Sequence, residues 1–358
     1  MKSYGVFLFY IWVMGLLASP LYAEEKGAVL AGVQTLQVFS PMRKQLLTVD
    51  VWYPAKQGGV ATEVGANKVF EGTPAWRDAP MINGRFPLIV LSHGSGSTVH
   101  GMSWLASALA QAGYIVAGPN HPRTTSGDST PEDTPKIWQR TNDLSTLISY
   151  LTSHDAWQER VDASRIGALG FSLGGAAVME IAGARADLAD YVSYCERYPD
   201  MADCYWFASG VAYIDQQKVN VPAFDLRDVD QALFEQSNRD TRIKMAILVD
   251  PSVAQAFDSH SLKQIHIPLS FINLGESTAV PVSVRTDALV ALVPNSSLVY
   301  INDAVHFSFL PECREGAVAF LKEVEETDTL CDDGRQRSRF DIQQELVQKI
   351  KTELANTL

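Results

Sequence analysis

A short pattern of the type Gly-x-Ser-x-Gly, from Gly170 to Gly174, limits the folds open to this chain more than any other feature. It lies where an expected strand, Arg165–Gly170, meets an expected helix rich in small residues, Gly175–Ala184. The flanking glycines allow a turn so sharp that Ser172 takes a strained backbone conformation and lifts its hydroxyl clear of the sheet. The helix N-terminus behind the serine offers free N–H groups where an oxyanion would form. We predict that Ser172 is a nucleophile, with a plain glycine turn as the alternative.

Strand-like and helix-like segments alternate through most of the chain. The expected strands are a hairpin of Thr35–Phe39 and Leu46–Tyr53, then Pro87–Ser92, Tyr114–Ala117, Arg165–Gly170, Lys244–Val249, Pro268–Asn273 and Leu298–Ile301. The expected helices are Met102–Ala112, Pro135–Ser153, Gly175–Ala184, Glu315–Glu326 and Asp341–Leu354. This alternation predicts an α/β fold, in which a mostly parallel sheet is covered by helices on both faces.

One segment, at about 188–243, interrupts the alternation and contains no clear strand. Eight aromatic side chains lie within Tyr191–Phe224, although aromatic residues make up only 9% of the chain. A long insertion of this composition is either a lid or pocket wall for an apolar substrate or a small helical unit that packs on its own aromatics. In the first case we expect Tyr205, Trp206 and Phe207 to contact the part of the substrate that does not react.

A serine nucleophile needs a base, and His306 is the best placed histidine. It follows the expected strand Leu298–Ile301 in a loop near the C-terminus. His93 and His100 lie before the nucleophile, beside the Gly-rich turn, and fit the role less well. His260 and His266 flank a short helix-to-strand connection, where we expect surface or structural roles. We therefore predict that His306 accepts the serine proton.

Two carboxylates can complete the arrangement, because each ends a strand and lies between Ser172 and His306 in the chain. Asp250 directly follows the expected strand Lys244–Val249, and Glu276 follows the expected strand Pro268–Asn273. The acid must hold the imidazole in the correct tautomer and stabilise its protonated form. The shorter side chain and sharper strand end favour Asp250, and Glu276 stays open as the alternative.

The turn His93–Ser97 directly follows a strand of buried type and contains small residues that let backbone N–H groups approach a ligand. We expect the N–H groups of Ser95 and Leu173 to form an oxyanion hole. The alternative is a loop that merely tolerates unusual backbone angles.

The first residues, 1–23, have the order of a secretory signal peptide. Lys2 precedes the apolar run Val6–Leu17, and small residues lead to Ala23. The run is short for a membrane span, which needs roughly 20 apolar residues. We predict a cleaved signal and an exported hydrolase domain, 24–358, in the periplasm or the medium. An uncleaved anchor is the alternative, because Leu21 is a poor residue three places from the cleavage site.

Four cysteines, an even number, agree with export, and three pairings can be drawn among them. Closeness in the chain favours Cys195–Cys204 and Cys313–Cys331, each worth about 2–4 kcal/mol. Buried thiols in a cytosolic protein are the alternative. Neither cysteines nor histidines show the spacing of metal ligands, so no metal or cofactor is expected. The net charge of −12 and the absence of Lys/Arg-rich stretches argue against nucleic-acid binding.

Six segments in order carry a resemblance to a known family: VLSHGSGS, LASALAQAGYIVAGPNH, GFSLGG, RIKMAILVDPS, IPLSFINLGES and AVHFSF. Together they resemble the predicted dienelactone hydrolase group of the α/β-hydrolase superfamily, which is related to the platelet-activating-factor acetylhydrolases. The resemblance spans roughly residues 85–325, apart from the insertion. The acetylhydrolase branch takes its acid from the strand that Asp250 ends here. Many dienelactone-hydrolase-like members carry an aspartate where this chain has Thr278, and dienelactone hydrolases proper use cysteine in place of Ser172.

The resemblance and the residues together predict a serine hydrolase that cleaves carboxylic esters through an acyl-enzyme. The expected substrate is a small-molecule or lipid ester with a short or medium acyl chain, including phospholipid acyl groups. No partner nucleic acid and no membrane-spanning segment after signal cleavage are expected. The alternatives are a peptidase or thioesterase on the same scaffold, and a non-catalytic envelope-binding protein.

Overall fold

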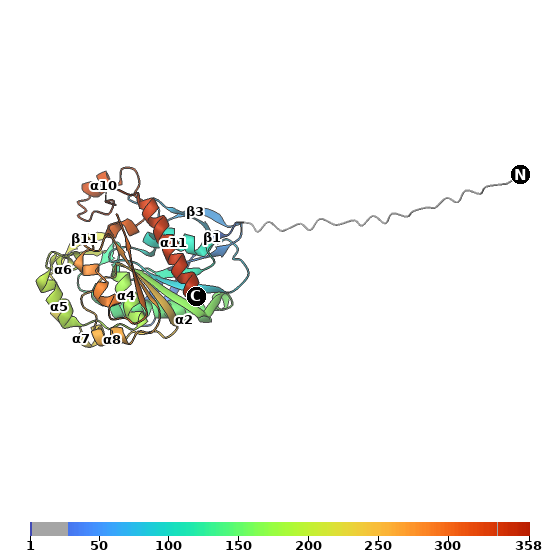
Figure 1. The fold of residues 1–358 in the computed structure, drawn as a ribbon. Helices are drawn as coiled ribbons and strands as arrows, with labels where there is room; N and C mark the ends of the chain where they lie inside the picture. The colour runs from blue at the N-terminus through green and yellow to red at the C-terminus, as the bar shows by residue number, and fades with distance from the viewer. Residues whose placement is uncertain (2–27, 335) are drawn as a thin grey trace.

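The structure is a computed structural model that describes residue 1, residues 28–334 and residues 336–358 (Figure 1). The predicted signal segment, 1–23, lies outside the described residues except for Met1. Among the helices of the described residues, none has the length and apolar character that crossing a membrane requires.

A ten-stranded sheet forms the centre of the fold, in the order β14-β13-β12-β9-β5-β6-β2-β1-β4-β3. From β14 to β6 all neighbours are parallel, whereas β2 joins β6 and β1 antiparallel. The strands are β1 Leu30–Ser40, β2 Gln45–Ala55, β3 Val60–Val64, β4 Thr73–Arg77, β5 Phe86–Ser92, β6 Ile115–Pro119, β9 Val161–Phe171, β12 Ile243–Val249, β13 Leu269–Leu274 and β14 Ser296–Ile301. The short outer strands β3 and β4 were not expected, since β4 contains Pro74 and both are largely exposed.

Helices cover both faces of this sheet, which confirms the predicted fold class. The helices and helical turns are η1 Val99–Met102, α1 Ser103–Gln111, α2 Ile137–Ser153, α3 Asp155–Gln158, α4 Leu173–Ala182, α5 Leu188–Arg197, α6 Ala202–Ala208, η2 Leu226–Asp228, α7 Gln231–Phe234, α8 Ser259–Lys263, η3 Val282–Val284, α9 Asp287–Val290, η4 His306–Phe309, α10 Ala317–Glu323 and α11 Arg339–Thr357.

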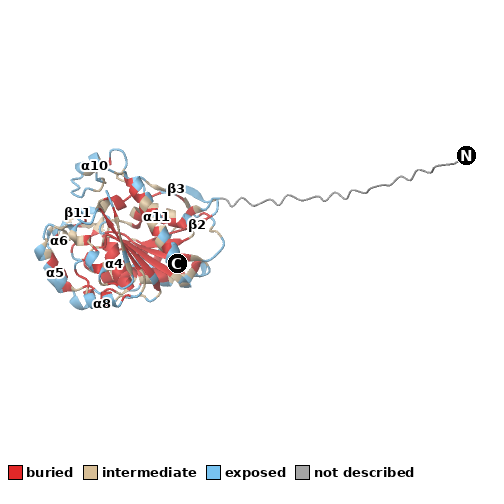
Figure 2. Cartoon of the chain, in the orientation of Figure 1, coloured by how far each residue is buried: buried red, intermediate tan, exposed pale blue. Residues whose placement is uncertain are grey.

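Alternation along the buried strands divides the core into two layers. Leu88 and Val90 of β5 pack in one cluster with α2 and α4, and Ile89 and Leu91 pack in the other with α1 and α11. Figure 2 shows the buried sheet in red between these helices. A strand buried on both faces explains why the sequence of β5 is a continuous apolar run.

The insertion at about 188–243 contains α5, α6 and α7, and it also contains a hairpin. The expectation of no clear strand is therefore corrected: β10 Val211–Ile214 pairs with β11 Gln217–Asn220, and β10 also pairs with β8 Asp128–Ser129. β8 pairs in turn with β7 Thr124–Thr125 to make a four-stranded sheet. The hairpin was missed because its turn residues, Asp215 and Gln216, lack the usual glycine although both have positive φ.

Most aromatics of the insertion pack on one another. The ring of Tyr191 contacts those of Tyr194, Phe207 and Phe234, and the carboxylate of Asp203 accepts hydrogen bonds from both tyrosine hydroxyls. The disulfide Cys195–Cys204 joins α5 to α6, and Cys313–Cys331 closes a second loop, so both favoured pairings are confirmed. These contacts join α5, α6 and α7, and their buried side chains continue the core layer that contains α2 and α4.

One carboxyl group lies in the core between α2 and α4. Glu180 on α4 is fully buried, and its Oε2 accepts hydrogen bonds from Thr141 Oγ1 (3.1 Å) and Asn238 Nδ2 (2.7 Å). Burial raises the pKa of Glu180 from 4.5 to about 8. The group is therefore protonated in the folded protein at neutral pH.

This carboxyl group should make stability depend on pH. Between pH 4.5 and about 8 the folded state holds a proton that the unfolded state has released, so the free energy of unfolding falls as the pH rises. The loss is on the order of 5 kcal/mol when complete. We expect the Glu180→Gln variant, which cannot ionise, to lose much less stability than the wild type between pH 5 and pH 9 in urea unfolding. Parallel curves for the two proteins would contradict this.

Candidate active site

The turn from β9 into α4 holds Ser172 in a strained conformation, with φ 55° and ψ −122°. The glycines of this turn are required by close packing. A Cβ on Gly170 would overlap the backbone of Gly174, and a Cβ on Gly174 would overlap the carbonyl of Ser92. The turn therefore presents the Ser172 side chain at the carboxyl end of the central strand.

The structure brings Ser172, His306 and Asp250 together in one chain of hydrogen bonds. His306 Nε2 lies 3.2 Å from Ser172 Oγ, and His306 Nδ1 lies 2.9 Å from Asp250 Oδ2. Because a carboxylate only accepts, Nδ1 carries the proton, and Nε2 is left to accept from the serine hydroxyl. The ring of His306 also stacks on Phe171, with centroids 4.7 Å apart, which fixes its plane.

Asp250 is buried, and the protein holds both of its oxygens. Oδ1 accepts from Asn273 Nδ2 and from the Leu274 N–H, both at 2.9 Å, while Oδ2 faces His306. Glu276 is exposed, and no hydrogen bond joins it to His306 among the described residues. The sheet order explains the difference, because β12 lies beside β9 whereas β13 lies one strand farther away.

The turn after β5 packs against the serine turn. A Cβ on Gly94 would lie 3.4 Å from Ser172 Cβ. The next residue, Ser95, is exposed, and its N–H has no hydrogen-bond partner among the described residues. The Leu173 N–H lies at the first position of α4, where a helix leaves its N–H groups free. Both N–H groups predicted for the oxyanion hole are thus without a hydrogen-bond partner among the described residues, and Leu173 directly follows the nucleophile.

A second serine contacts the nucleophile and was missed in the sequence. Ser252 Oγ lies 3.3 Å from Ser172 Oγ, and the Ser252 N–H donates to the Ser172 carbonyl at 3.0 Å. Positive φ angles at Asp250 (43°) and Val253 (60°) flank this serine, an unusual conformation for a β-branched valine. In the sequence, Ser252 could have been noticed because it lies two residues after Asp250. Its contact with Ser172 could not be predicted from that position.

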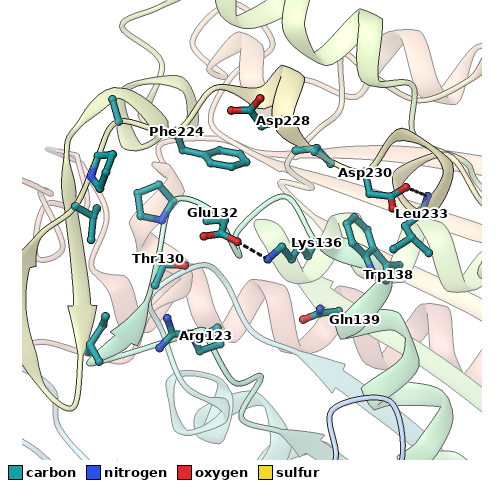
Figure 3. A pocket seen from close by; sticks show the side chains of 16 residues that line it. Arg123, Thr130, Glu132, Lys136, Trp138, Gln139, Phe224, Asp228, Asp230 and Leu233 are labelled. Carbon is teal, nitrogen blue, oxygen red and sulfur yellow. Dashed lines mark hydrogen bonds and ion pairs between the residues drawn. The ribbon is translucent and has the colours of Figure 1, made fainter.

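A cavity of about 720 Å³ lies between the insertion and the segment that follows β6 (Figure 3). Its walls include Arg123, Lys136 and Trp138 from that segment and Val221, Phe224 and Leu233 from the insertion. None of the three aromatics expected to form a pocket wall lines it. Tyr205 is exposed, Trp206 donates from Nε1 to Thr134 Oγ1 at 2.9 Å, and Phe207 is buried in the core layer that contains α2 and α4.

Metal ligands do not gather anywhere in the described part of the chain. Across residues 28–334 and 336–358, no three His, Cys, Asp or Glu side chains form a cluster that could hold an ion.

A mostly parallel sheet whose central strand turns through a strained serine into a helix is the arrangement of the α/β-hydrolase fold, and this chain has that fold. The ferulic acid esterase from Streptomyces cinnamoneus has the same fold, with a TM-score of 0.59 at 16% identity over 95% of this chain and 92% of that one. A dienelactone hydrolase from Anabaena variabilis aligns with a TM-score of 0.43 at 15% identity, over 83% and 95% of the two chains. The sheet topology and the match to the ferulic acid esterase thus confirm the fold that the resemblance implied.

In a comparison of sequences, residues 64–196 match the family described as "PETase: PET hydrolase-like". A bis(hydroxyethyl) terephthalate hydrolase from Streptomyces coelicolor is 28% identical over 119 residues, which are 33% of this chain and 36% of that protein. The match therefore spans about a third of the length of this curated relative. The family match includes Ser95, Ser172 and Leu173, and it ends before Asp250 and His306.

Proposed function

We propose that this protein is a serine hydrolase that cleaves carboxylic esters through an acyl-enzyme. The observation that carries the proposal is the hydrogen-bonded chain from Asp250 through His306 to Ser172. Such a chain on a strand-to-helix turn is the arrangement that activates a serine hydroxyl. The names of the matched family and of the Streptomyces coelicolor relative, both ester hydrolases, support the same reaction.

In the first half of the proposed reaction, His306 Nε2 takes the proton of Ser172 as Oγ attacks the ester carbonyl carbon. The buried Asp250 carboxylate stabilises the imidazolium that forms. The N–H groups of Ser95 and Leu173 hold the oxyanion. The C–O bond to the alcohol then breaks, and the alcohol leaves with the proton from His306.

In the second half, the same histidine removes a proton from water, which attacks the acyl carbon. The oxyanion forms again at the same two N–H groups, and the bond to Ser172 Oγ breaks as His306 returns the proton. The products are the free acid and the free enzyme.

The relatives and the cavity support a proposal for the substrate class. The matched relative is named for a terephthalate ester. We therefore propose esters of aromatic acids as substrates, in addition to the short and medium acyl esters expected from the sequence. Phe224 and Trp138 line the cavity and can pack against an aromatic ring or an acyl chain. Two disulfides support the proposal that the protein acts outside the cytosol.

A fluorophosphonate probe and a substrate panel test the proposed function. We expect the probe to label the wild type at Ser172 and the enzyme to hydrolyse bis(hydroxyethyl) terephthalate or p-nitrophenyl esters from acetate to octanoate. Matched amide and thioester substrates should react far more slowly. Faster turnover of the amide or the thioester would favour the peptidase or thioesterase alternative, and a protein that does not label would favour a binding protein.

The cavity should determine the preference for acyl chain length. Its wall residue Arg123 precedes Thr124, whose carbonyl accepts a hydrogen bond from the Gly96 N–H of the turn after β5, and we propose that the acyl chain extends from Ser172 toward this cavity. Each buried methylene contributes about 0.8 kcal/mol. We expect Phe224→Ala to flatten the rise of kcat/KM from acetyl to octanoyl esters while acetyl ester hydrolysis is nearly unchanged.

The matched control for this prediction is Trp206→Ala. Trp206 belongs to the same insertion but does not line the cavity, so the dependence on chain length should stay as in the wild type. If kcat/KM rises less with acyl chain length in Trp206→Ala than in Phe224→Ala, α6 and not the cavity wall at Phe224 forms the acyl pocket.

A further inference from the structure

Beneath the turn His93–Ser97 lies a cluster of buried polar side chains that the proposed reaction does not use. The cluster consists of Ser92, His93, His121, Arg140 and Asp143, none of them more than 1% exposed. Taking a guanidinium out of water is costly unless its surroundings compensate the charge. The contacts of Arg140 show what this buried charge faces.

Arg140, on α2, directs its guanidinium at the backbone of the turn. Nη1 donates to the carbonyl of His93 at 2.7 Å, and Nη2 lies 3.2 Å from His93 Nδ1 and 3.4 Å from the carbonyl oxygen of Gly94, to which it donates. Nε donates to Thr124 Oγ1 at 3.0 Å. Within the described part of the chain, no carboxylate lies at salt-bridge distance from Arg140; Asp143 pairs with Arg43 and His121. The charge of Arg140 is thus directed at carbonyl oxygens of the turn.

His93 holds the same carbonyl from a second side. Its Nε2 accepts from the His121 N–H at 3.1 Å, so the proton of the neutral ring is on Nδ1, which donates to the Gly94 carbonyl at 2.7 Å. Burial lowers the pKa of His93 well below its usual range, which keeps the ring neutral. The Ser97 N–H adds a third donor at 3.4 Å.

The orientation of this carbonyl sets the direction of the next N–H. The peptide bond from Gly94 to Ser95 is trans, so the Gly94 C=O and the Ser95 N–H point in opposite directions. With the carbonyl held inside the cluster, the Ser95 N–H points away from the cluster, and Gly94, the residue before it, lies against Ser172.

We propose that Arg140 is a positioning residue that, with His93, fixes the Gly94–Ser95 peptide plane and so preorganises the oxyanion hole. The inference rests on the proposed function. Glycine at position 94 permits rotation of this peptide plane at low cost. When the plane rotates, the carbonyl oxygen replaces the N–H beside the nucleophile and repels the oxyanion. Charge-assisted donors on the carbonyl prevent this rotation and polarise the peptide toward a stronger N–H donor.

The test compares Arg140→Lys and Arg140→Met with the wild type. Loss of one oxyanion donor lowers kcat by about 10²–10³-fold. We expect a fall of about that size in Arg140→Met, a smaller fall in Arg140→Lys, and a KM within about threefold of wild type. The affinity for a trifluoromethyl ketone, which forms an oxyanion on Ser172, should fall in parallel with kcat because both depend on the same N–H groups.

The control is Arg43→Lys, since Arg43 is also buried and bonds Asp143 but donates to Pro122 rather than to the turn. We expect Arg43→Lys to lower the melting temperature with kcat and ketone affinity close to wild type. If Arg140→Met does not fold, the folded Arg140→Lys variant decides the question. An unchanged kcat and ketone affinity in Arg140→Lys, or an equal fall in Arg43→Lys, would overturn the inference alone. A wild type without esterase activity would overturn the proposed function, and this inference with it.

Discussion

Replacing Ser172 by alanine is expected to remove nearly all ester hydrolysis, by about 10⁴-fold or more in kcat. Its Oγ is the atom that His306 Nε2 contacts at 3.2 Å, so the variant keeps the base but lacks the nucleophile. His306→Ala should cause a loss of the same order, because the serine hydroxyl then has no acceptor for its proton. Combining the two changes should add little, since the residues act as one unit.

The measurements are kcat on a p-nitrophenyl ester and labelling by a fluorophosphonate, with thermal unfolding to show that each variant folds. His266→Ala is the matched control for the histidine, because His266 is exposed and lies outside the site. Activity within a few fold of wild type in either Ser172→Ala or His306→Ala would show that the nucleophile or the base lies elsewhere.

The second large effect is expected for Asp250→Asn, which should lower kcat by about 10³–10⁴-fold. The Asn273 and Leu274 donors will hold the amide oxygen of the new side chain, which turns its NH₂ group toward His306. Nδ1 must then accept, the ring proton moves to Nε2, and Nε2 can no longer accept from Ser172. The variant therefore keeps its shape and loses the correct tautomer.

Glu276→Gln is the matched comparison, because Glu276 was the other acid that the chain order allowed. Glu276 is exposed and follows β13, which is not a neighbour of β9 in the sheet. Its replacement should therefore change kcat by less than about threefold. Rates measured on one ester at a pH where wild type is fully active decide between the two. A larger loss in Glu276→Gln than in Asp250→Asn would move the acid to position 276.

Several features of this protein could be predicted from the sequence because they depend on neighbouring residues. The turn at Ser172 follows from glycines two places away on each side, and the buried strand β5 follows from its continuous apolar run. The disulfide Cys195–Cys204 joins residues nine positions apart, so chain proximity was enough to favour it. In each case the required information lies within one short segment.

Other features required the tertiary structure, because they join residues far apart in the chain. Asp250 and Glu276 both follow strands, and only the sheet order, in which β12 lies next to β9, brings the first beside His306. Arg140 lies 47 residues after His93, and nothing in the pattern of α2 shows that its guanidinium faces that turn. Local sequence determines backbone conformation and burial, but which strand ends and helix faces meet depends on the packing of the whole sheet.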